Sequence, residues 1–232
     1  MIEDFDSVTS FTSDDQAGLT QFDLSEFVRR VLAEDMGSGG DVTSRATIDA
    51  LARFTATMNC REPIVVAGLD IAIAFFRALD REVRISAKVA DGDRVAAGGV
   101  LMTIEGNARA MLAAERSALN TLQHLSGVAT CTRTYVDAID GTGAILLDTR
   151  KTIPGLRLLE KYAARMGGAQ NHRMRMDDGL LIKDNHVGVA GSVGGGGSRG
   201  GGGEHRAAGP GRGRSDRADR ASDRSRREPA FA

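Results

Sequence analysis

Three short polar segments carry the residue types best suited to binding an anionic ligand. Residues 148–152 (DTRKT), 171–173 (NHR) and 183–186 (KDNH) each combine a basic side chain with carboxylate, amide or hydroxyl groups. Arginine offers a planar pair of donors that matches a carboxylate, and lysine offers a point charge that suits phosphate. Together the segments predict a site for a ligand with several carboxylates or phosphates.

The basic side chains of these segments are expected to share one pocket. They are Arg150, Lys151, His172, Arg173 and Lys183. Keeping so many positive charges away from water is costly unless anions neutralise them. A lone Arg-Lys pair after a strand is more often a solvated loop, and a lone histidine is more often structural. Clustering favours the site, because three of the chain's four lysines fall within residues 151–183. Two of these sit at the ends of predicted strands, whereas Lys161 is predicted to be only a helix-surface residue.

The elements around these segments predict how the segments meet. Residues 144–149 and 179–184 are apolar runs typical of buried parallel strands, and residues 155–166 between them have helical spacing. Ligands in α/β folds bind at the carboxyl ends of parallel strands, which is where the polar segments fall. The region therefore predicts one strand–helix–strand repeat of a barrel or an open sheet.

The residues before this repeat predict further helices and strands. Helices are expected from Asp23, as N-cap, to residue 35, then at 68–79 and 108–139, where Gly127 could divide the last one. Strands are expected at 52–60, 82–89 and within 91–106, and a loop is expected at 37–44.

Composition excludes several classes of protein. The chain has 232 residues, a formal net charge of −1 and 41% hydrophobic residues, so bulk charge points to neither nucleic acid nor membrane. No apolar run reaches the roughly 18–20 residues of a membrane span, and MIEDFDSVTS is not a secretory signal. Cys60 and Cys131 cannot form a disulfide framework; we expect both to pack as small hydrophobic residues in a reducing cytoplasm.

The two ends of the chain differ from its middle. Residues 1–20 hold five acidic residues and no basic one, which predicts a disordered acidic leader. Residues 194–232 hold 11 Gly and nine Arg but no Leu, Ile, Val, Met or Tyr. Such a segment buries too little apolar surface to offset the entropy of ordering, so we expect it to be disordered.

Several long motifs resemble the quinolinate phosphoribosyltransferase family. They are DTRKTIPGLRLLEKYAARMGG, NHRM, DDGLLIKDNHV and the upstream AERSALNTLQHLSGVAT, and the leading EDMGSGGDVTS also resembles the family's N-terminal segment. The resemblance implies an α/β fold, with an N-terminal α/β sandwich domain followed by the first part of an incomplete α/β (TIM-like) barrel. Residues 21–127 would form the sandwich and residues 128–193 the start of the barrel, between the leader 1–20 and the tail 194–232.

The resemblance also implies a function. The family transfers the phosphoribosyl group of phosphoribosyl pyrophosphate to the ring nitrogen of quinolinate. Decarboxylation then gives nicotinate mononucleotide, pyrophosphate and CO2 in NAD biosynthesis. Mg²⁺ accompanies phosphoribosyl pyrophosphate, and each site of the homodimer borrows an arginine from the partner. We therefore expect a cytoplasmic, dimeric transferase with no membrane or nucleic-acid partner.

Roles carry over from the family to single positions. The matched binders of quinolinate are Arg116, Thr149, Arg150, His172 and Arg173. Lys151 and Lys183 match lysines that lie near both substrates. Arg116, in AERSALN, matches the arginine donated across the dimer, although by position alone it would be an exposed helix charge.

The sequence departs from the family pattern after GVAGSV. The family continues through an Ala-rich helix and further barrel strands, whose acidic residues serve the ribose hydroxyls and Mg²⁺. No counterpart is visible in residues 194–232, so no metal ligand is predicted. An alanine codon GCG read one base later gives Arg, and read two bases later gives Gly, so we expect a frameshift near codons 192–195. An inactive, truncated remnant is therefore an alternative.

Parts of the sequence also match other functions. A related phosphoribosyltransferase with another pyridine-type acceptor would share the motifs. An RNA-binding module would use the Arg-Gly tail, which lacks interleaved aromatic residues. The stretch VADGDRVAAGGVLMTIEG resembles a biotinyl or lipoyl carrier, but its hairpin tip is Ala97-Gly98-Gly99 and holds no lysine.

Overall fold

An antiparallel sheet of three strands forms one layer of the protein. The computed structural model describes Leu19 and residues 22–191. The sheet has the order β1 (Arg53–Asn59), β5 (Val100–Asn107), β3 (Arg84–Ala87), and Met58 pairs with Met102 across β1 and β5. Met102, Ile104 and Gly106 alternate along β5 and are buried, so one face of the sheet faces the core.

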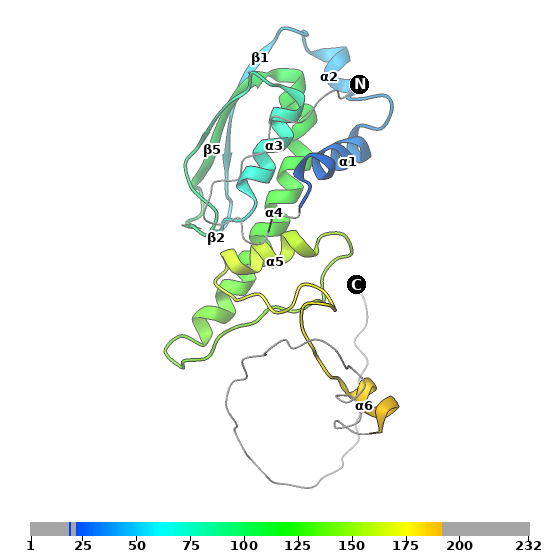
Figure 1. The fold of residues 1–232 in the computed structure, drawn as a ribbon. Coiled ribbons are helices and arrows are strands. Elements are labelled where there is room, and N and C mark those ends of the chain that lie inside the picture. Colours follow the sequence, from blue (N-terminus) through cyan, green and yellow to red (C-terminus); the bar gives the residue numbers. More distant parts are fainter. Residues whose placement is uncertain (1–18, 20–21, 192–232) are drawn as a thin grey trace, which may run out of the picture. The chain divides into compact units, whose positions relative to one another are not determined.

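Helices α3 (Leu69–Leu79) and α4 (Ala108–Ala138) lie on that face of the sheet, and α1 (Leu24–Met36) packs on these two helices (Figure 1). Helix α3 is buried along most of its length, which its almost wholly apolar sequence predicts. Helix α4 is continuous, so the suggestion that Gly127 could divide it is wrong; Gly127 lies on an exposed face where one glycine is tolerated. The predicted helices and the strands at 52–60, 82–89 and 91–106 are confirmed within a few residues.

Two smaller elements complete this part of the chain. Asp23 accepts a hydrogen bond from Glu26 N at 2.8 Å, which confirms it as the N-cap of α1. Residues 37–44 are not all loop, because Asp41 caps the short helix α2 (Val42–Thr47) by accepting from Ser44 N at 2.9 Å. Strands β2 (Ile64–Val65) and β4 (Arg94–Val95) pair as a separate ribbon.

Helix α5 (Arg157–Met166) packs on α4 and is tied to the sheet region by Asp91. The Asp91 carboxylate accepts from Gly68 N at 2.7 Å and from Leu69 N at 3.0 Å, and so caps the start of α3. It also accepts from the hydroxyl of Tyr162 in α5 at 2.7 Å. One carboxylate therefore fixes the position of α5 relative to α3.

The two buried strands predicted at 144–149 and 179–184 do not form in the described part of the chain. A single parallel bridge pairs Leu147 with Gln170. Ile145 is 62% exposed and Leu180 is 98% exposed. A parallel strand is buried on both faces and needs neighbouring strands, and the described residues supply none. The apolar pattern of these two runs could not show that neighbouring strands are missing from the described residues.

The described chain divides after Leu180 into two units. In the second, α6 (Asp184–Ala190) has no buried residue. The predictions for residues 1–18, 20–21 and 194–232 lie outside the described residues. Leu19, which the sequence analysis placed in a disordered leader, is instead buried in the core. Among the described helices, none combines the length and the apolar character needed to cross a membrane.

Gly167 and Gly127 form a pair for testing the packing of α4 on α5. A Cβ at Gly167 would lie 2.6 Å from Thr132 Cβ, whereas a Cβ at Gly127 would meet nothing within 4 Å. We expect Gly167→Ala to lower the free energy of unfolding by about 2 kcal/mol through overpacking. Gly127→Ala should raise it by about 0.5–1 kcal/mol through helix propensity. Urea unfolding followed by circular dichroism measures both, and equal effects would contradict the close α4–α5 contact.

Candidate functional site

Asp148 is the centre of a hydrogen-bond hub. Its carboxylate accepts from the Lys161 ammonium, from Asn171 Nδ2 at 2.6 Å and from His172 N at 2.7 Å. Its own N–H donates to Gln170 O at 3.1 Å, beside the bridge at Leu147. The hub therefore holds the end of segment 144–148 against the start of segment 171–173.

Lys161 is a buried partner of this hub. Its side chain is 1% exposed and that of Asp148 is 9% exposed. The prediction that Lys161 is a surface residue of the helix is wrong, because its face of α5 turns inward with Leu159 and Tyr162. A buried ammonium needs a carboxylate, and Asp148 provides it. The scarcity of lysine in this chain was the one sequence feature that could have indicated its importance.

The hub brings together two of the three predicted ligand-binding segments. Thr149, Arg150 and Lys151 follow Asp148 directly, and His172 and Arg173 follow Asn171. The backbone of His172 is bonded to Asp148, so both segments leave from the same point. The structure thus groups these predicted residues, and their roles toward a ligand stay predictions.

Two arginines of the group have buried nitrogens without a partner. The Nε atoms of Arg150 and Arg173 are buried and have no hydrogen-bond partner among the described residues. Arg173 also donates from one terminal nitrogen to Gly179 O at 2.7 Å, which sets the direction of its side chain. Buried N–H groups are usually paired, so these two donors are unsatisfied in the described structure.

The remaining loop residues differ in how they are held. Thr149 Oγ1 accepts from Lys151 N at 3.1 Å and so shapes its own loop, while the side chain of Lys151 is exposed. After Arg173, the carboxylate of Asp178 accepts from Met174 N at 2.6 Å and from Arg175 N at 3.2 Å. Burial raises the pKa of Asp178, but these hydrogen bonds outweigh it, and the net pKa lies below the usual value.

Lys183 lies in the second unit, just before α6. Its N–H donates to His186 Nδ1 at 2.9 Å, and its side chain is exposed. Its predicted place beside the other cations stays a prediction.

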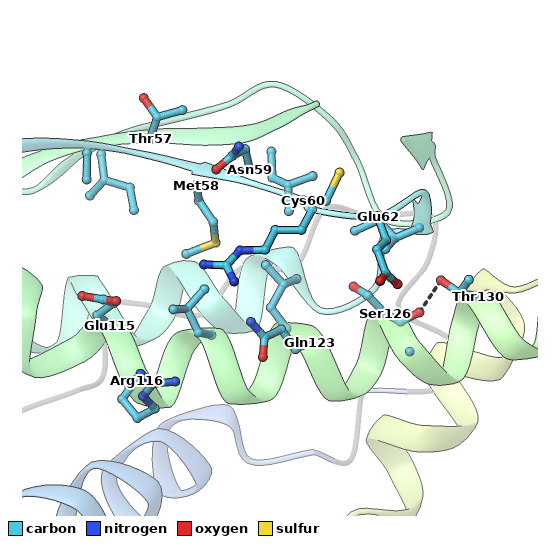
Figure 2. A pocket seen from close by; sticks show the side chains of 18 of the residues that line it. Thr57, Met58, Asn59, Cys60, Glu62, Glu115, Arg116, Gln123, Ser126 and Thr130 are labelled. Carbon is cyan, nitrogen blue, oxygen red and sulfur yellow. Dashed lines mark hydrogen bonds between the residues drawn. The ribbon is translucent and has the colours of Figure 1, made fainter. Parts of the chain in front are cut away.

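Arg116 lines a different cavity. It is exposed on α4 and borders an open groove of about 1,210 Å³ between α4 and the residues of β1 and β5. Figure 2 shows Arg116, Glu115 and Gln123 along α4, with Met58 and Cys60 on the strand side. None of residues 149–183 lines this groove among the described residues. Within one chain, Arg116 is therefore not grouped with Arg150.

The two cysteines are both free thiols but have different environments. Cys60 is buried, as predicted, and its Sγ donates to Ala96 O at 3.1 Å. Cys131 is exposed, so the prediction that it packs as a small hydrophobic residue is wrong. The reason is that its side of α4 borders two open cavities.

Sequence reasoning missed His124 and Glu160. Glu160 Oε2 accepts from Ile153 N at 3.0 Å, and Glu160 Oε1 lies 2.9 Å from His124 Nε2. In the chain, Glu160 is 7 residues from Ile153 and 36 residues from His124, and no motif spacing reveals such contacts. They anchor the loop that carries Arg150.

Taken together, the arrangement suits a ligand with neighbouring carboxylates. Two arginines and a histidine lie on two segments that one carboxylate holds together, and an arginine fork matches a carboxylate. The described residues contain no group of three or more His, Cys, Asp or Glu that could hold a metal ion.

Family models match both parts of the chain. The model for the quinolinate phosphoribosyl transferase N-terminal domain matches residues 41–126, and that for the C-terminal domain matches residues 128–195. Nicotinate-nucleotide pyrophosphorylase [carboxylating] of Mycobacterium leprae is 46% identical over 179 residues, covering 75% of this chain and 62% of that protein. A probable nicotinate-nucleotide pyrophosphorylase [carboxylating] of Synechocystis is 42% identical, covering 73% and 57%.

Solved structures agree with these matches. NadC from Streptococcus pyogenes superposes with a TM-score of 0.74 at 39% identity, covering 78% of this chain and 64% of that one. The matches confirm the predicted fold class, a sandwich domain followed by the first part of an incomplete barrel. The chain spans about 60% of the length of the two relatives from Mycobacterium leprae and Synechocystis.

The Asp148–Lys161 pair gives a prediction about stability. Lys161→Met leaves the carboxylate buried without its counter-charge, and we expect a loss of about 3–5 kcal/mol in the free energy of unfolding. The double variant Asp148→Asn with Lys161→Met should lose less than Lys161→Met alone, because it buries no uncompensated charge.

Lys88→Met is the matched control, since Lys88 is exposed and its ammonium donates to the neighbouring Ser86 Oγ at 2.8 Å. It should change stability by less than about 0.5 kcal/mol. Urea unfolding of all variants measures these differences. A Lys161→Met loss as small as that of the control would show that the pair is not buried.

Proposed function

Because this chain belongs to the quinolinate phosphoribosyltransferase family, we propose that it binds quinolinate and phosphoribosyl pyrophosphate and transfers the phosphoribosyl group to the quinolinate ring nitrogen. Decarboxylation of the product then yields nicotinate mononucleotide, with pyrophosphate and CO2. The chain spans only part of the length of its relatives. The proposal therefore concerns the substrate contacts that the residues of this chain can make.

The observation that carries the proposal is the hub at Asp148. It joins the Arg150 loop to His172 and Arg173, and the Nε atoms of both arginines are buried without a partner. Quinolinate has two adjacent carboxylates on one pyridine ring. Two arginines that approach from separate segments, with a histidine beside them, offer donors to both carboxylates. A ligand with one carboxylate would leave part of this donor set unpaired.

The residues contribute mainly by binding and orienting. Breakage of the bond between the anomeric carbon and pyrophosphate builds positive charge on the ribose and negative charge on the leaving group. We assign Lys151 and Lys183 to the negative charge, as point charges suited to phosphate oxygens. Arg150, His172 and Arg173 hold the acceptor so that its nitrogen faces the anomeric carbon. Once that nitrogen is alkylated it is a cation that stabilises the electron pair left on the adjacent ring carbon when CO2 departs, and that carbon then takes a proton from water.

We also propose that Mg²⁺ arrives with phosphoribosyl pyrophosphate. The described residues do not fit a metal site of their own. They contain no cluster of three suitable ligands, and the nearby Asp148 already accepts from Lys161, Asn171 and His172.

We propose a homodimer in which Arg116 serves the partner's site. The proposal is supported by the exposure of Arg116 on an open groove that none of residues 149–183 lines. An exposed arginine beside such a groove can reach a ligand held by a second copy. A cytoplasmic location is consistent with both cysteines being free thiols.

Ligand selectivity tests the acceptor. Calorimetric titration should show quinolinate binding at least about tenfold more tightly than nicotinate, because nicotinate lacks the second carboxylate. Arg150→Gln should weaken quinolinate binding about tenfold or more and leave nicotinate binding less affected. Arg30→Gln, an exposed change on α1, is the control and should alter neither.

With phosphoribosyl pyrophosphate and Mg²⁺ added, carboxyl-labelled quinolinate should release CO2. Equal binding and turnover of nicotinate would favour another pyridine-type acceptor.

Mixed dimers test the role of Arg116. Arg116→Ala and Arg150→Gln should each lose transfer activity alone. After unfolding and refolding together, roughly a quarter of the sites combine an intact Arg150 with the partner's intact Arg116, so activity should return to about that level. No gain on mixing would show that each site is built within one copy.

A further inference from the structure

Glu160 binds two partners that are far apart in the chain. One carboxylate oxygen accepts from Ile153 N at 3.0 Å, and the other lies 2.9 Å from His124 Nε2. The Glu160 side chain is 11% exposed and that of His124 is 36% exposed. A largely buried carboxylate with both oxygens engaged is held in one orientation.

These contacts anchor the far end of the loop that carries the predicted ligand-binding residues. At its near end, residues 149–153 follow Asp148, which the hub fixes through Lys161, Asn171 and His172. At its far end, the N–H of Ile153 is bound to Glu160. Arg150 and Lys151 lie between these two anchors.

The contact with His124 connects this loop to α4. The loop's other side-chain bond near Ile153, from Arg157 Nε to Thr152 Oγ1 at 3.2 Å, reaches only the neighbouring start of α5. His124 lies in the middle of α4, the longest described helix. It also lines a cavity of about 590 Å³ together with Asp148, so the partner of Glu160 and the centre of the hub border the same space. Helix α4 therefore serves as a rigid reference for the loop.

We propose that Glu160 is a positioning residue that, held by His124, sets the geometry of the Arg150–Lys151 loop for its dicarboxylate ligand. The identity of the ligand rests on the proposed function. The anchoring of the loop by Glu160 rests only on the hydrogen bonds described above. A bound ligand gains most from donors that are already in place, since loop ordering on binding lowers affinity.

Four variants test the proposal, and one of them is His124→Ala. Glu160→Ala removes both contacts. Glu160→Gln keeps an oxygen for Ile153 N and an amide group for His124 while it removes the charge. Glu34→Ala is the control for loss of one helix carboxylate, because Glu34 lies on the exposed surface of α1. Thermal unfolding of each variant shows that it is folded before it is compared.

Hydrogen exchange measured by mass spectrometry reads out the anchoring without any ligand. A peptide spanning residues 149–156 should exchange at least about tenfold faster in Glu160→Ala than in the wild type, with Glu160→Gln and Glu34→Ala near the wild type. His124→Ala should give an intermediate rate, since the carboxylate keeps Ile153 N but loses its orientation. Unchanged exchange in Glu160→Ala overturns the proposal.

Titration with quinolinate reads out the consequence for binding. Glu160→Ala should bind about tenfold more weakly, and Glu160→Gln should bind nearly as well as the wild type. Faster exchange with unchanged affinity would show an anchor that does not position the ligand, which also overturns the proposal. If the wild type binds no quinolinate, the proposed function fails, whereas the exchange result still decides whether Glu160 holds the loop.

Discussion

The buried carboxylate of Asp148 is the constraint on which the candidate site depends. It lies at the end of the only described parallel bridge and accepts from a lysine of α5, an amide and a backbone N–H. A buried ion pair contributes little net stability compared with a well-packed apolar pair. What it provides is a unique arrangement, because a slip of either segment would leave a charge buried and unpaired. Segments 149–151 and 172–173 are therefore placed by electrostatics and only weakly by apolar packing.

A second carboxylate extends this constraint to the sheet domain. Asp91 caps α3 and accepts from the Tyr162 hydroxyl of α5. Lys161, the partner of Asp148, is the neighbouring residue of that tyrosine. Adjacent side chains of α5 thus connect the ligand-binding segments on one side and the start of α3 on the other. Glu160 adds the third connection, to α4 through His124.

The sequence predicted best those features that depend on nearby residues. Helix α1 begins where Asp23 can cap it, and α3 follows its apolar run, because capping and helical spacing are local. The grouping of Arg150 with His172 and Arg173 also followed from sequence, since both segments flank one helix. Burial of Lys161 could not be predicted in this way. Its charge is tolerated only because Asp148, 13 residues earlier, faces it, and that contact is a property of the folded chain.

The strands predicted at 144–149 and 179–184 show the opposite case. Their apolar sequence suits a barrel interior, yet Ile145 and Leu180 are exposed because the described residues supply no neighbouring strands. The ligand-binding loop keeps its form all the same. Its anchors, Asp148 and Glu160, take their partners from α4, α5 and residues 170–172, and none from a sheet. The geometry of the site is thus fixed by hydrogen bonds to helices, while closure of a barrel requires strands beyond them. The form of the loop that carries Arg150 and the closure of a barrel therefore depend on different contacts.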